Sequence, residues 1–324
     1  MRIKKLKIFS LLNTFFYLFL CLFLFAFVNV VNAETENKND IKSDVKSDNK
    51  PENKTIKINV YVSYSLSEVV KEAAEDFKQI YLKDNAKNDK KIDFEFNFFV
   101  NSNSMLLSKI AKDNQNFDLL FCDSQKISQI AIQKNLIHQN FAFLSDSVWV
   151  VVSKNLAKIP HNINELQDFH IHKILISQAE DDKILKYIKN LFQQQENYKT
   201  WSVLQDQQNK IFYTTSSIQN LELLSNNQAD ASFALLSEAT QFIDKDKLQI
   251  AFEIDLGNYV INYFSAVNVN KDYQKDDNTK QQYEIMQSFL DYLQNPDNKN
   301  YESFAKIYKK YGYQEAKQEI LQVQ

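Results

Sequence analysis

Hydrophobic and polar residues follow two different periods from residue 55 onward. Residues 56–62 alternate β-branched and polar side chains, which predicts a half-buried strand. The sequence Ser65-Leu66-Ser67-Glu68 has the form of a capping box, which predicts the start of a helix. Apolar residues then recur at helical spacing at Val69, Val70, Ala73, Ala74 and Phe77. We therefore expect a strand followed directly by an amphipathic helix.

This strand-and-helix unit recurs along the chain. Further strands are predicted at residues 92–98, 117–122, 173–177, 211–213 and 231–235, and helices at 105–111, 124–134, 182–193 and from 217 onward. Such alternation is typical of α/β proteins with a mostly parallel sheet and helices on both faces. Two longer β-rich stretches, 147–153 and 259–267, interrupt the alternation and are candidates for strands that cross between two lobes.

The N-terminal segment, residues 1–33, has the features of a secretory signal peptide. Basic residues precede a long apolar run, and the small residue Ala33 stands before an acidic and polar stretch. The apolar run is long enough for an uncleaved anchor, but the abrupt change at Glu34 favours cleavage. Residues 34–54 contain almost no apolar side chains, which predicts a flexible leader.

About 270 residues remain after the leader, which is more than one compact core usually holds. We therefore predict two lobes. Lobe I would comprise residues 55–146 together with 268–324, and lobe II would comprise residues 147–267, including the crossover strands.

Composition excludes several functional classes. Removal of the four basic residues of the N-terminal segment changes the net charge from −3 to about −7, so no nucleic-acid footprint remains. Two glycines in 324 residues leave no glycine-rich phosphate loop and no GxSxG elbow. The four histidines show no metal-ligand spacing, although His170 and His172 would share a strand face. Cys122 would be the one cysteine left, most simply a buried thiol at a strand end. We expect no enzyme activity, no cofactor and no metal site.

Three polar turns follow predicted strands. In open α/β sheets, ligands bind beyond the carboxyl ends of strands, where helix N-termini present free amides. Hydroxyls and amides without a charged partner suit a desolvated oxyanion, although each turn also has a simpler explanation as a helix N-cap. The turns contain Ser63 and Ser65; Asn101, Ser102, Asn103 and Ser104; and Thr214, Thr215, Ser216 and Ser217.

Motifs at both ends of the predicted fold resemble those of the periplasmic molybdate-binding proteins that serve ABC importers. The closing motif is Phe289-Leu-Asp-Tyr-Leu-Gln-Asn-Pro296, followed by residues 304–313. The opening motif is Val60-Tyr-Val-Ser-Tyr-Ser65-Leu66, and Phe117-Asp118-Leu119 is similar to the family's Ala-Asp-Leu before its third strand. The resemblance implies a type II periplasmic binding protein fold, in which two crossover strands join two α/β lobes and the solute lies between them.

The resemblance also implies site residues in the first lobe. Ser65 takes the place of the family's first oxyanion-binding serine. Asn103 takes the place of the second, with Ser102 and Ser104 beside it.

The second lobe departs from the family pattern. The family's remaining ligand amide falls at Ile218, just after Ser217, and its ligand tyrosine aligns with Leu235, which lacks a hydroxyl. A Gly-Asp-Pro segment of the family is replaced by residues 177–182, which bring three carboxylates. The half-site of the first lobe therefore matches the family, whereas that of the second lobe is rewritten.

The function implied by the resemblance is that of a monomeric, periplasmic solute-binding protein. It would bind a small oxyanion, such as molybdate or tungstate, and deliver it to an inner-membrane ABC permease. The rewritten second half-site leaves two alternatives open: a related fold that binds an organic solute, and an envelope scaffold that has lost its ligand. Aromatic residues near predicted strand ends could line a larger ligand: Tyr61, Tyr64, Trp149, Tyr213 and Tyr263.

Overall fold

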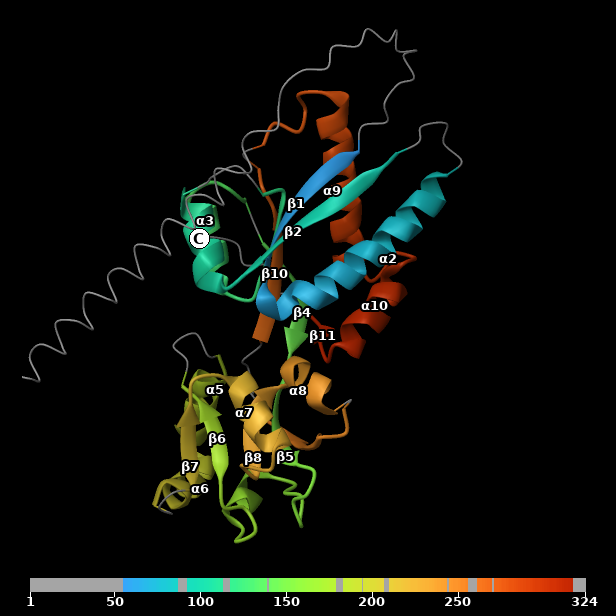
Figure 1. Cartoon of the computed structure of the whole chain (residues 1–324). Helices are drawn as coiled ribbons and strands as arrows, with labels where there is room; N and C mark the ends of the chain where they lie inside the picture. The colour runs from blue at the N-terminus through green and yellow to red at the C-terminus, as the bar shows by residue number, and fades with distance from the viewer. Residues whose placement is uncertain are drawn as a thin grey trace, which may run out of the picture. The chain divides into compact units, whose positions relative to one another are not determined.

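The computed structural model describes most of the chain beyond residue 54 (Figure 1). The described residues are 55–86, 92–112, 117–138, 140–178, 183–193, 195–206, 210–243, 245–255, 261–269 and 271–316. The predicted signal peptide and leader, residues 1–54, lie outside them. Among the helices that are described, none has both the length and the apolar character needed to cross a membrane.

The first sheet has the strand order β11-β4-β10-β3-β1-β2. Its strands are β1 (Ile56–Ser63), β2 (Phe94–Asn101), β3 (Leu119–Cys122), β4 (Phe141–Asp146), β10 (Ile261–Val267) and β11 (Gln314–Glu315). The helical segments that accompany it are η1 (Tyr64–Leu66), α2 (Ser67–Asn85), α3 (Asn103–Lys112), α4 (Gln125–Gln133), α9 (Asp277–Gln294) and α10 (Tyr301–Lys310). The C-terminal helices therefore return to the sheet that the N-terminal strand begins.

The second sheet has the strand order β7-β6-β8-β5-β9. Its strands are β5 (Val148–Ser153), β6 (Ile174–Ser177), β7 (Ile211–Thr214), β8 (Ala231–Leu235) and β9 (Leu248–Glu253). The helical segments around it are η2 (Ile163–Gln167), α5 (Lys183–Gln193), α6 (Gln195–Asp206), α7 (Ser217–Ser225) and α8 (Leu236–Ile243).

The two sheets confirm the predicted α/β class, but both are mixed and not mostly parallel. β1 lies parallel to β2 and β3, and β6 lies parallel to β7 and β8. β10 runs antiparallel to β3 and β4, and β5 runs antiparallel to β8 and β9. β5 is the first strand of the second sheet after the chain leaves the first sheet, and β10 is the strand with which the chain re-enters the first sheet. Both run antiparallel to their neighbours.

The two β-rich stretches each belong to one sheet. The chain leaves the first sheet at Ser147, between β4 and β5, and β5 pairs within the second sheet. It returns between β9 and β10, where residues 256–260 are not described, and β10 pairs within the first sheet. The sequence boundaries placed 261–267 in lobe II as a crossover strand, whereas this segment is a central strand of the first sheet.

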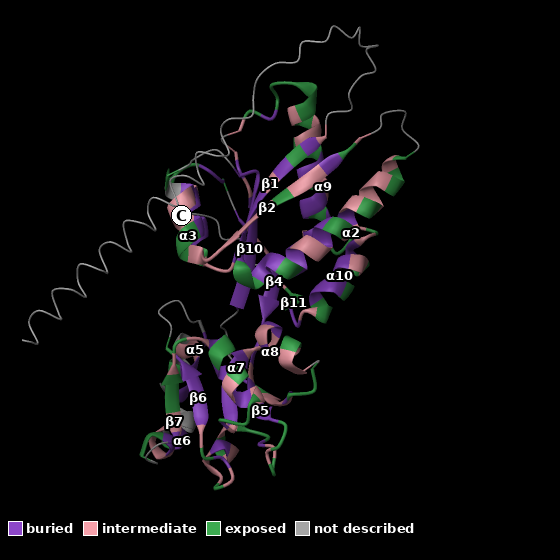
Figure 2. Cartoon of the chain, in the orientation of Figure 1, coloured by how far each residue is buried: buried purple, intermediate pink, exposed green. Residues whose placement is uncertain are grey.

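The alternation along β1 supplies two separate cores. Ile58, Val60 and Val62 are buried in the cluster that includes α2, α9 and α10, whereas Tyr61 is buried in the cluster with α3 and α4. Figure 2 shows the inner strands β10 and β4 largely buried, whereas the edge strand β2 is mostly intermediate. Cys122 at the end of β3 is buried in the second of these clusters, which confirms the predicted buried thiol.

The predicted capping box at Ser65 is not formed. Ser65 lies in the 3-10 turn η1, and α2 begins at Ser67 without a side-chain cap. Ser67 instead donates its hydroxyl to the carbonyl oxygen of Tyr64. The chain uses an extra turn here, and this turn frees the Ser65 side chain for other contacts. A capping box is present at the start of α9, where Asp276 and Thr279 cap each other.

Gly312 in the closing motif occupies a backbone conformation that favours glycine. Its φ is +79°, and a Cβ at this position would lie 2.8 Å from the carbonyl oxygen of Leu236 and in closer contact with the hydroxyl of Thr240. Substitution Gly312→Ala should lower the free energy of unfolding by about 1–2 kcal/mol from the left-handed conformation alone. Denaturant unfolding would measure the loss.

The double variant Gly312→Ala with Thr240→Ala separates the two causes. It removes the hydroxyl contact but leaves both the backbone strain and the contact with the Leu236 carbonyl oxygen. Compared with Thr240→Ala alone, the double variant should therefore still lose part of the unfolding free energy that Gly312→Ala loses. A Gly312→Ala protein as stable as the wild type would show that the turn accommodates a side chain.

Candidate solute-binding site

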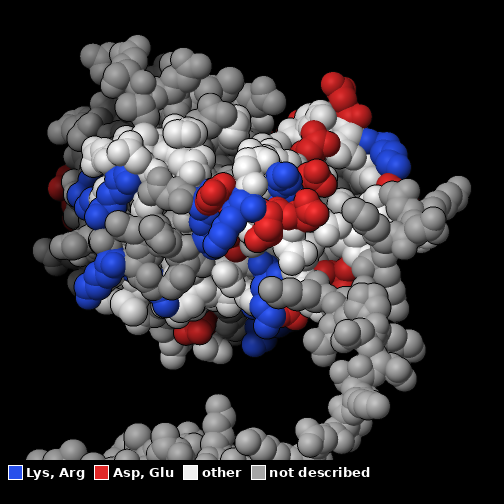
Figure 3. All heavy atoms as spheres, turned by 90° about the horizontal axis from the view of Figure 1, so that it is seen from above, with Lys and Arg blue, Asp and Glu red and all other residues white. Residues whose placement is uncertain are grey.

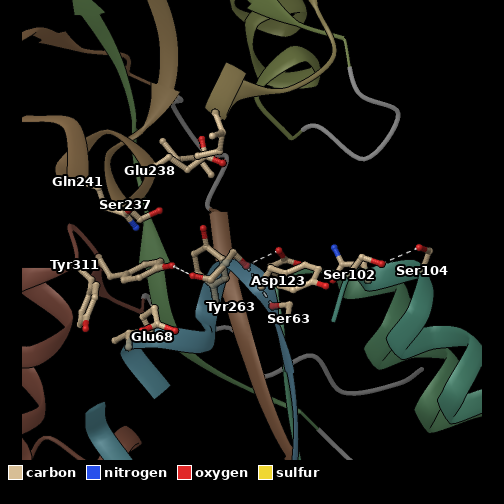
Figure 4. Close-up of a pocket in the computed structure, with 17 residues that line it drawn as sticks. Ser63, Glu68, Ser102, Ser104, Asp123, Ser237, Glu238, Gln241, Tyr263 and Tyr311 are labelled. Atoms are coloured by element: carbon tan, nitrogen blue, oxygen red, sulfur yellow. Dashed lines mark hydrogen bonds between the residues drawn. The ribbon is translucent and has the colours of Figure 1, made fainter. Parts of the chain in front are cut away.

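A pocket of about 460 Å³ is formed by strand ends of both sheets (Figure 4). The first sheet contributes the turns after β1, β2 and β3, and the second contributes the end of β8 and the starts of α7 and α8. The carboxyl ends of the parallel strands β1, β2 and β3 meet at one edge, the usual ligand position in open α/β sheets. The lining residues are Ser63, Tyr64, Ser65, Glu68, Val69, Ser102, Asn103, Ser104, Asp123, Ile218, Leu235, Ser237, Glu238, Gln241, Tyr263, Tyr311 and Tyr313.

The structure brings most of the sequence-predicted site residues to this pocket. Six of the seven line it: Ser65, Ser102, Asn103, Ser104, Ile218 and Leu235. Ser217 does not, because it is buried at the start of α7. Of the rewritten segment, Ser177 ends β6, while the three carboxylates of the segment, at residues 180–182, lie outside the described residues.

The hydroxyl of Ser65 is already engaged. Its Oγ donates to Oδ2 of Asp123 over 2.7 Å, and the hydroxyls of Ser63 and Ser65 are 3.2 Å apart. The backbone carbonyl of Ser65 accepts a hydrogen bond from the Tyr313 hydroxyl at 2.5 Å. Because a serine has a single hydroxyl proton, Ser65 presents lone pairs and no donor to a ligand while this bond is made.

The turn after β2 places three polar side chains on the pocket. The hydroxyls of Ser102 and Ser104 are 3.1 Å apart, and Ser102 Oγ accepts a weak bond of 3.4 Å from the amide of Met105 in the first turn of α3. The side-chain oxygen of Asn103 is buried and receives no hydrogen bond from the described residues. This turn therefore serves partly as a helix cap and partly as pocket lining.

Sequence reasoning missed the acidic character of the pocket. Glu68, Asp123 and Glu238 line it, and the described lining contains no Lys, Arg or His. Lys71 neutralises Glu68 through a contact of 3.0 Å. On the outer face in Figure 3, by contrast, acidic and basic side chains are interspersed. Asp123 could have been found from the sequence, because it directly follows the third parallel strand.

Asp146 lies behind the pocket wall and joins three of its parts. The buried carboxylate accepts hydrogen bonds from Ser237 Oγ at 2.5 Å, the Tyr263 hydroxyl at 3.0 Å and the Ser147 amide at 2.8 Å. Burial raises the pKa of Asp146 to about 6, although these hydrogen bonds oppose the rise. Burial also raises the pKa of Tyr263 and of Tyr313, with a further contribution from the Asp146 charge. The charge of Asp146 therefore acts on two tyrosines that line the pocket.

Metal binding finds no support in this arrangement. Across the described part of the chain, no three His, Cys, Asp or Glu side chains are grouped so that they could hold a metal ion. His170 and His172 lie outside the pocket lining.

Several solved structures are similar to this chain. One is a substrate-binding domain assigned to a molybdenum ABC transporter of Clostridium difficile, with 18% identity, a TM-score of 0.60, and coverage of 81% of this chain and all of that one. The periplasmic molybdate-binding protein of Azotobacter vinelandii has 13% identity, a TM-score of 0.52, and coverage of 80% and 100%. Iron-bound HitA of Pseudomonas aeruginosa has 11% identity, a TM-score of 0.51, and coverage of 78% and 84%. These similarities confirm the two-lobed periplasmic binding protein fold.

No curated protein matches the chain. The profile of the family described as "Bacterial extracellular solute-binding protein" matches residues 58–314, which include nearly the whole described fold and every residue of the pocket. The chain therefore belongs to the family of bacterial extracellular solute-binding proteins.

Proposed function

We propose that this chain is the solute-binding component of an ABC-type importer. It is exported to the periplasm by residues 1–33, acts as a monomer and delivers its solute to an inner-membrane permease. Family membership supports the solute-binding role. The observation that carries the proposal is the pocket, because residues from both sheets line it. A solute bound there contacts both lobes, and closure of two lobes around a ligand is a common response in such proteins.

The pocket supports a polar organic solute better than a small oxyanion. A carboxylate about 4 Å from one unit of negative charge raises the energy by about 4 kcal/mol at an effective dielectric near 20. Three carboxylates line the pocket, and the proton of Ser65 that an oxyanion would need is donated to Asp123. A solute that brings its own hydrogen-bond donors meets neither obstacle.

A small oxyanion such as molybdate or tungstate is the second candidate. The hydroxyl and amide groups of Ser63, Ser102, Asn103 and Ser104 converge on the pocket, and such groups hold anions without a charged partner. The start of α7 at Ile218 adds the positive end of a helix dipole. The apolar Leu235 supplies no hydroxyl on the opposite side.

Thermal unfolding of the purified protein tests the proposal. Solutes would be added singly: molybdate, tungstate, sulfate, phosphate, amino acids, amines and sugars. A ligand at one hundred times its Kd stabilises the native state by about 2.7 kcal/mol, which raises the Tm by several degrees. A rise with a polar organic solute is the expected result. A selective rise with molybdate and tungstate would favour the second candidate, and no rise with any solute would indicate an envelope scaffold without a ligand.

The double variant Ser65→Ala with Asn103→Ala should abolish binding of whichever solute is found. Both side chains line the pocket on the half-site that matches the family, and their loss removes polar groups from two separate turns. Isothermal titration calorimetry would compare the variant with the wild type. Ser288→Ala is the matched control, because Ser288 lies on α9 and does not line the pocket. Unchanged affinity in the double variant would disprove the assignment of these two residues.

A further inference from the structure

We infer that the solute carries a protonated nitrogen with N–H groups, a primary ammonium or a guanidinium, and that Asp123 binds it. This inference rests on the proposed solute-binding function and specifies the charge of the solute.

The charge of the pocket wall is negative on the side of Asp123. Glu68 is paired with Lys71, whereas Asp123 lines the pocket and forms no ion pair with a described residue. The buried Asp146 accepts hydrogen bonds from Ser237 and Tyr263, which also line the pocket. Cationic solutes are attracted into a pocket of this sign, and anionic solutes are repelled from it.

Asp123 has one oxygen in use and one available. Its Oδ2 accepts the hydrogen bond from Ser65, whereas its Oδ1 is buried and receives no hydrogen bond from any described residue. A buried carboxylate oxygen without a donor is unfavourable. An ionised carboxylate can only accept hydrogen bonds, so the missing partner must be a donor. Molybdate and tungstate have no donor to offer, whereas an ammonium or guanidinium group does.

The surrounding lining suits the same kind of group. The side-chain oxygen of Asn103 is a second buried acceptor without a donor from the described residues. Ser65 presents lone pairs beside Asp123, and Tyr64 and Tyr263 add aromatic rings that can attract a cation. Quaternary ammonium ions lack the N–H groups that these acceptors need. Hydrogen bonds from a charged N–H donor are stronger than those from a neutral donor, which favours an N–H cation over a neutral solute.

Calorimetric titration of the protein with named probes tests this inference. The cationic probes are putrescine, spermidine, L-lysine and L-arginine; the comparison probes are choline, D-glucose, molybdate and phosphate. At least one N–H cation should bind, more weakly as sodium chloride is added. Asp123→Asn should weaken this binding by tenfold to a hundredfold, because it removes a charge-assisted acceptor. Asp206→Asn, an exposed acid at the end of α6 outside the pocket lining, makes the same charge change and should leave the affinity unchanged.

The outcomes separate this inference from the proposed function. Binding of choline, glucose or an anion alone would overturn the inference while the solute-binding function stands. Binding of an N–H cation that Asp123→Asn leaves unchanged would also overturn it. A protein that binds none of the probes, and none in the wider thermal screen, would contradict the proposed function itself. If Asp123→Asn fails to fold, Glu238→Gln removes another lining carboxylate and tests the charge of the pocket, with weaker cation binding expected.

Discussion

The substitution Asp118→Ala is expected to lower the free energy of unfolding by about 3–5 kcal/mol. It leaves the largely buried ammonium of Lys271 and two further hydrogen-bond donors without their acceptor. Asp118 is fully buried between the first sheet and the segment before α9. Its Oδ1 accepts a hydrogen bond from the Lys271 ammonium at 2.7 Å and one from the Tyr273 hydroxyl at 3.2 Å. Its Oδ2 accepts the backbone amide of Asn59 at 2.7 Å.

The size of the effect comes from the groups that Asp118 leaves behind. The Lys271 side chain is about three-quarters buried, with 24% of its surface exposed, so its charge is only partly hydrated once the carboxylate is gone. The amide in β1 and the Tyr273 hydroxyl would also lose their acceptor. Each buried donor left without a partner costs about 1–3 kcal/mol.

Chemical denaturation of the variant and the wild type would measure the loss. Tyr273→Phe is the graded comparison, because it removes one donor and leaves no orphaned group, so a much smaller loss is expected. Asp84→Ala is the matched control. Asp84 forms an ion pair with Lys299 at 2.8 Å, but both side chains are exposed, and no measurable change is expected. A wild-type stability in Asp118→Ala would show that water reaches and hydrates Lys271.

The same Asp118 shows how far sequence reasoning reached. Phe117-Asp118-Leu119 was recognised through its family resemblance, and the structure gives the aspartate a structural role away from the pocket. The partner Lys271 is 153 residues away in the chain, and no local pattern connects the two. The strands and helices themselves could be predicted, because hydrophobic periodicity is a local property.

The candidate site was predictable where it follows from strand ends. The turns after β1 and β2 were identified as polar positions beyond parallel strands, and both line the pocket. Glu238 and Tyr313 were missed because their positions depend on how distant segments pack, whereas Asp123 directly follows β3 and could have been found. Tyr313 contacts Ser65 across 248 residues of sequence. The directions of the strands could not be predicted either, because hydrophobic periodicity does not show whether β5 and β10 run parallel or antiparallel to their neighbours.

Asp146 is expected to make the stability of the protein fall as the pH rises from about 4 to about 6. Burial raises the pKa of Asp146 to about 6 in the folded protein, whereas an aspartate in the unfolded chain titrates near pH 3.9. Between these values the folded state binds the proton more tightly than the unfolded state does. The stabilising contribution of the protonated Asp146 is therefore complete below pH 4 and is lost as the pH passes through 6.

The expected size of this effect is about 3 kcal/mol, from about two pKa units at 1.36 kcal/mol each. Denaturant unfolding at pH 4, 5, 6 and 7 would compare the wild type with Asp146→Asn. The amide cannot ionise, so the difference in unfolding free energy between the two proteins should change by about this amount across the range. The contributions of the other carboxylates are common to both proteins and largely cancel in the difference.

Parallel pH profiles of the two proteins would contradict this expectation, and they would have a specific physical meaning. The carboxylate would then be as stable in the folded protein as in water. The hydrogen bonds from Ser237, Tyr263 and Ser147 would have to replace the lost hydration completely. These bonds tie the β4–β5 crossover to β10 and α8, and Ser237 and Tyr263 also line the pocket. The pH dependence of the difference in unfolding free energy would therefore show how much of the desolvation cost of Asp146 these hydrogen bonds leave uncompensated.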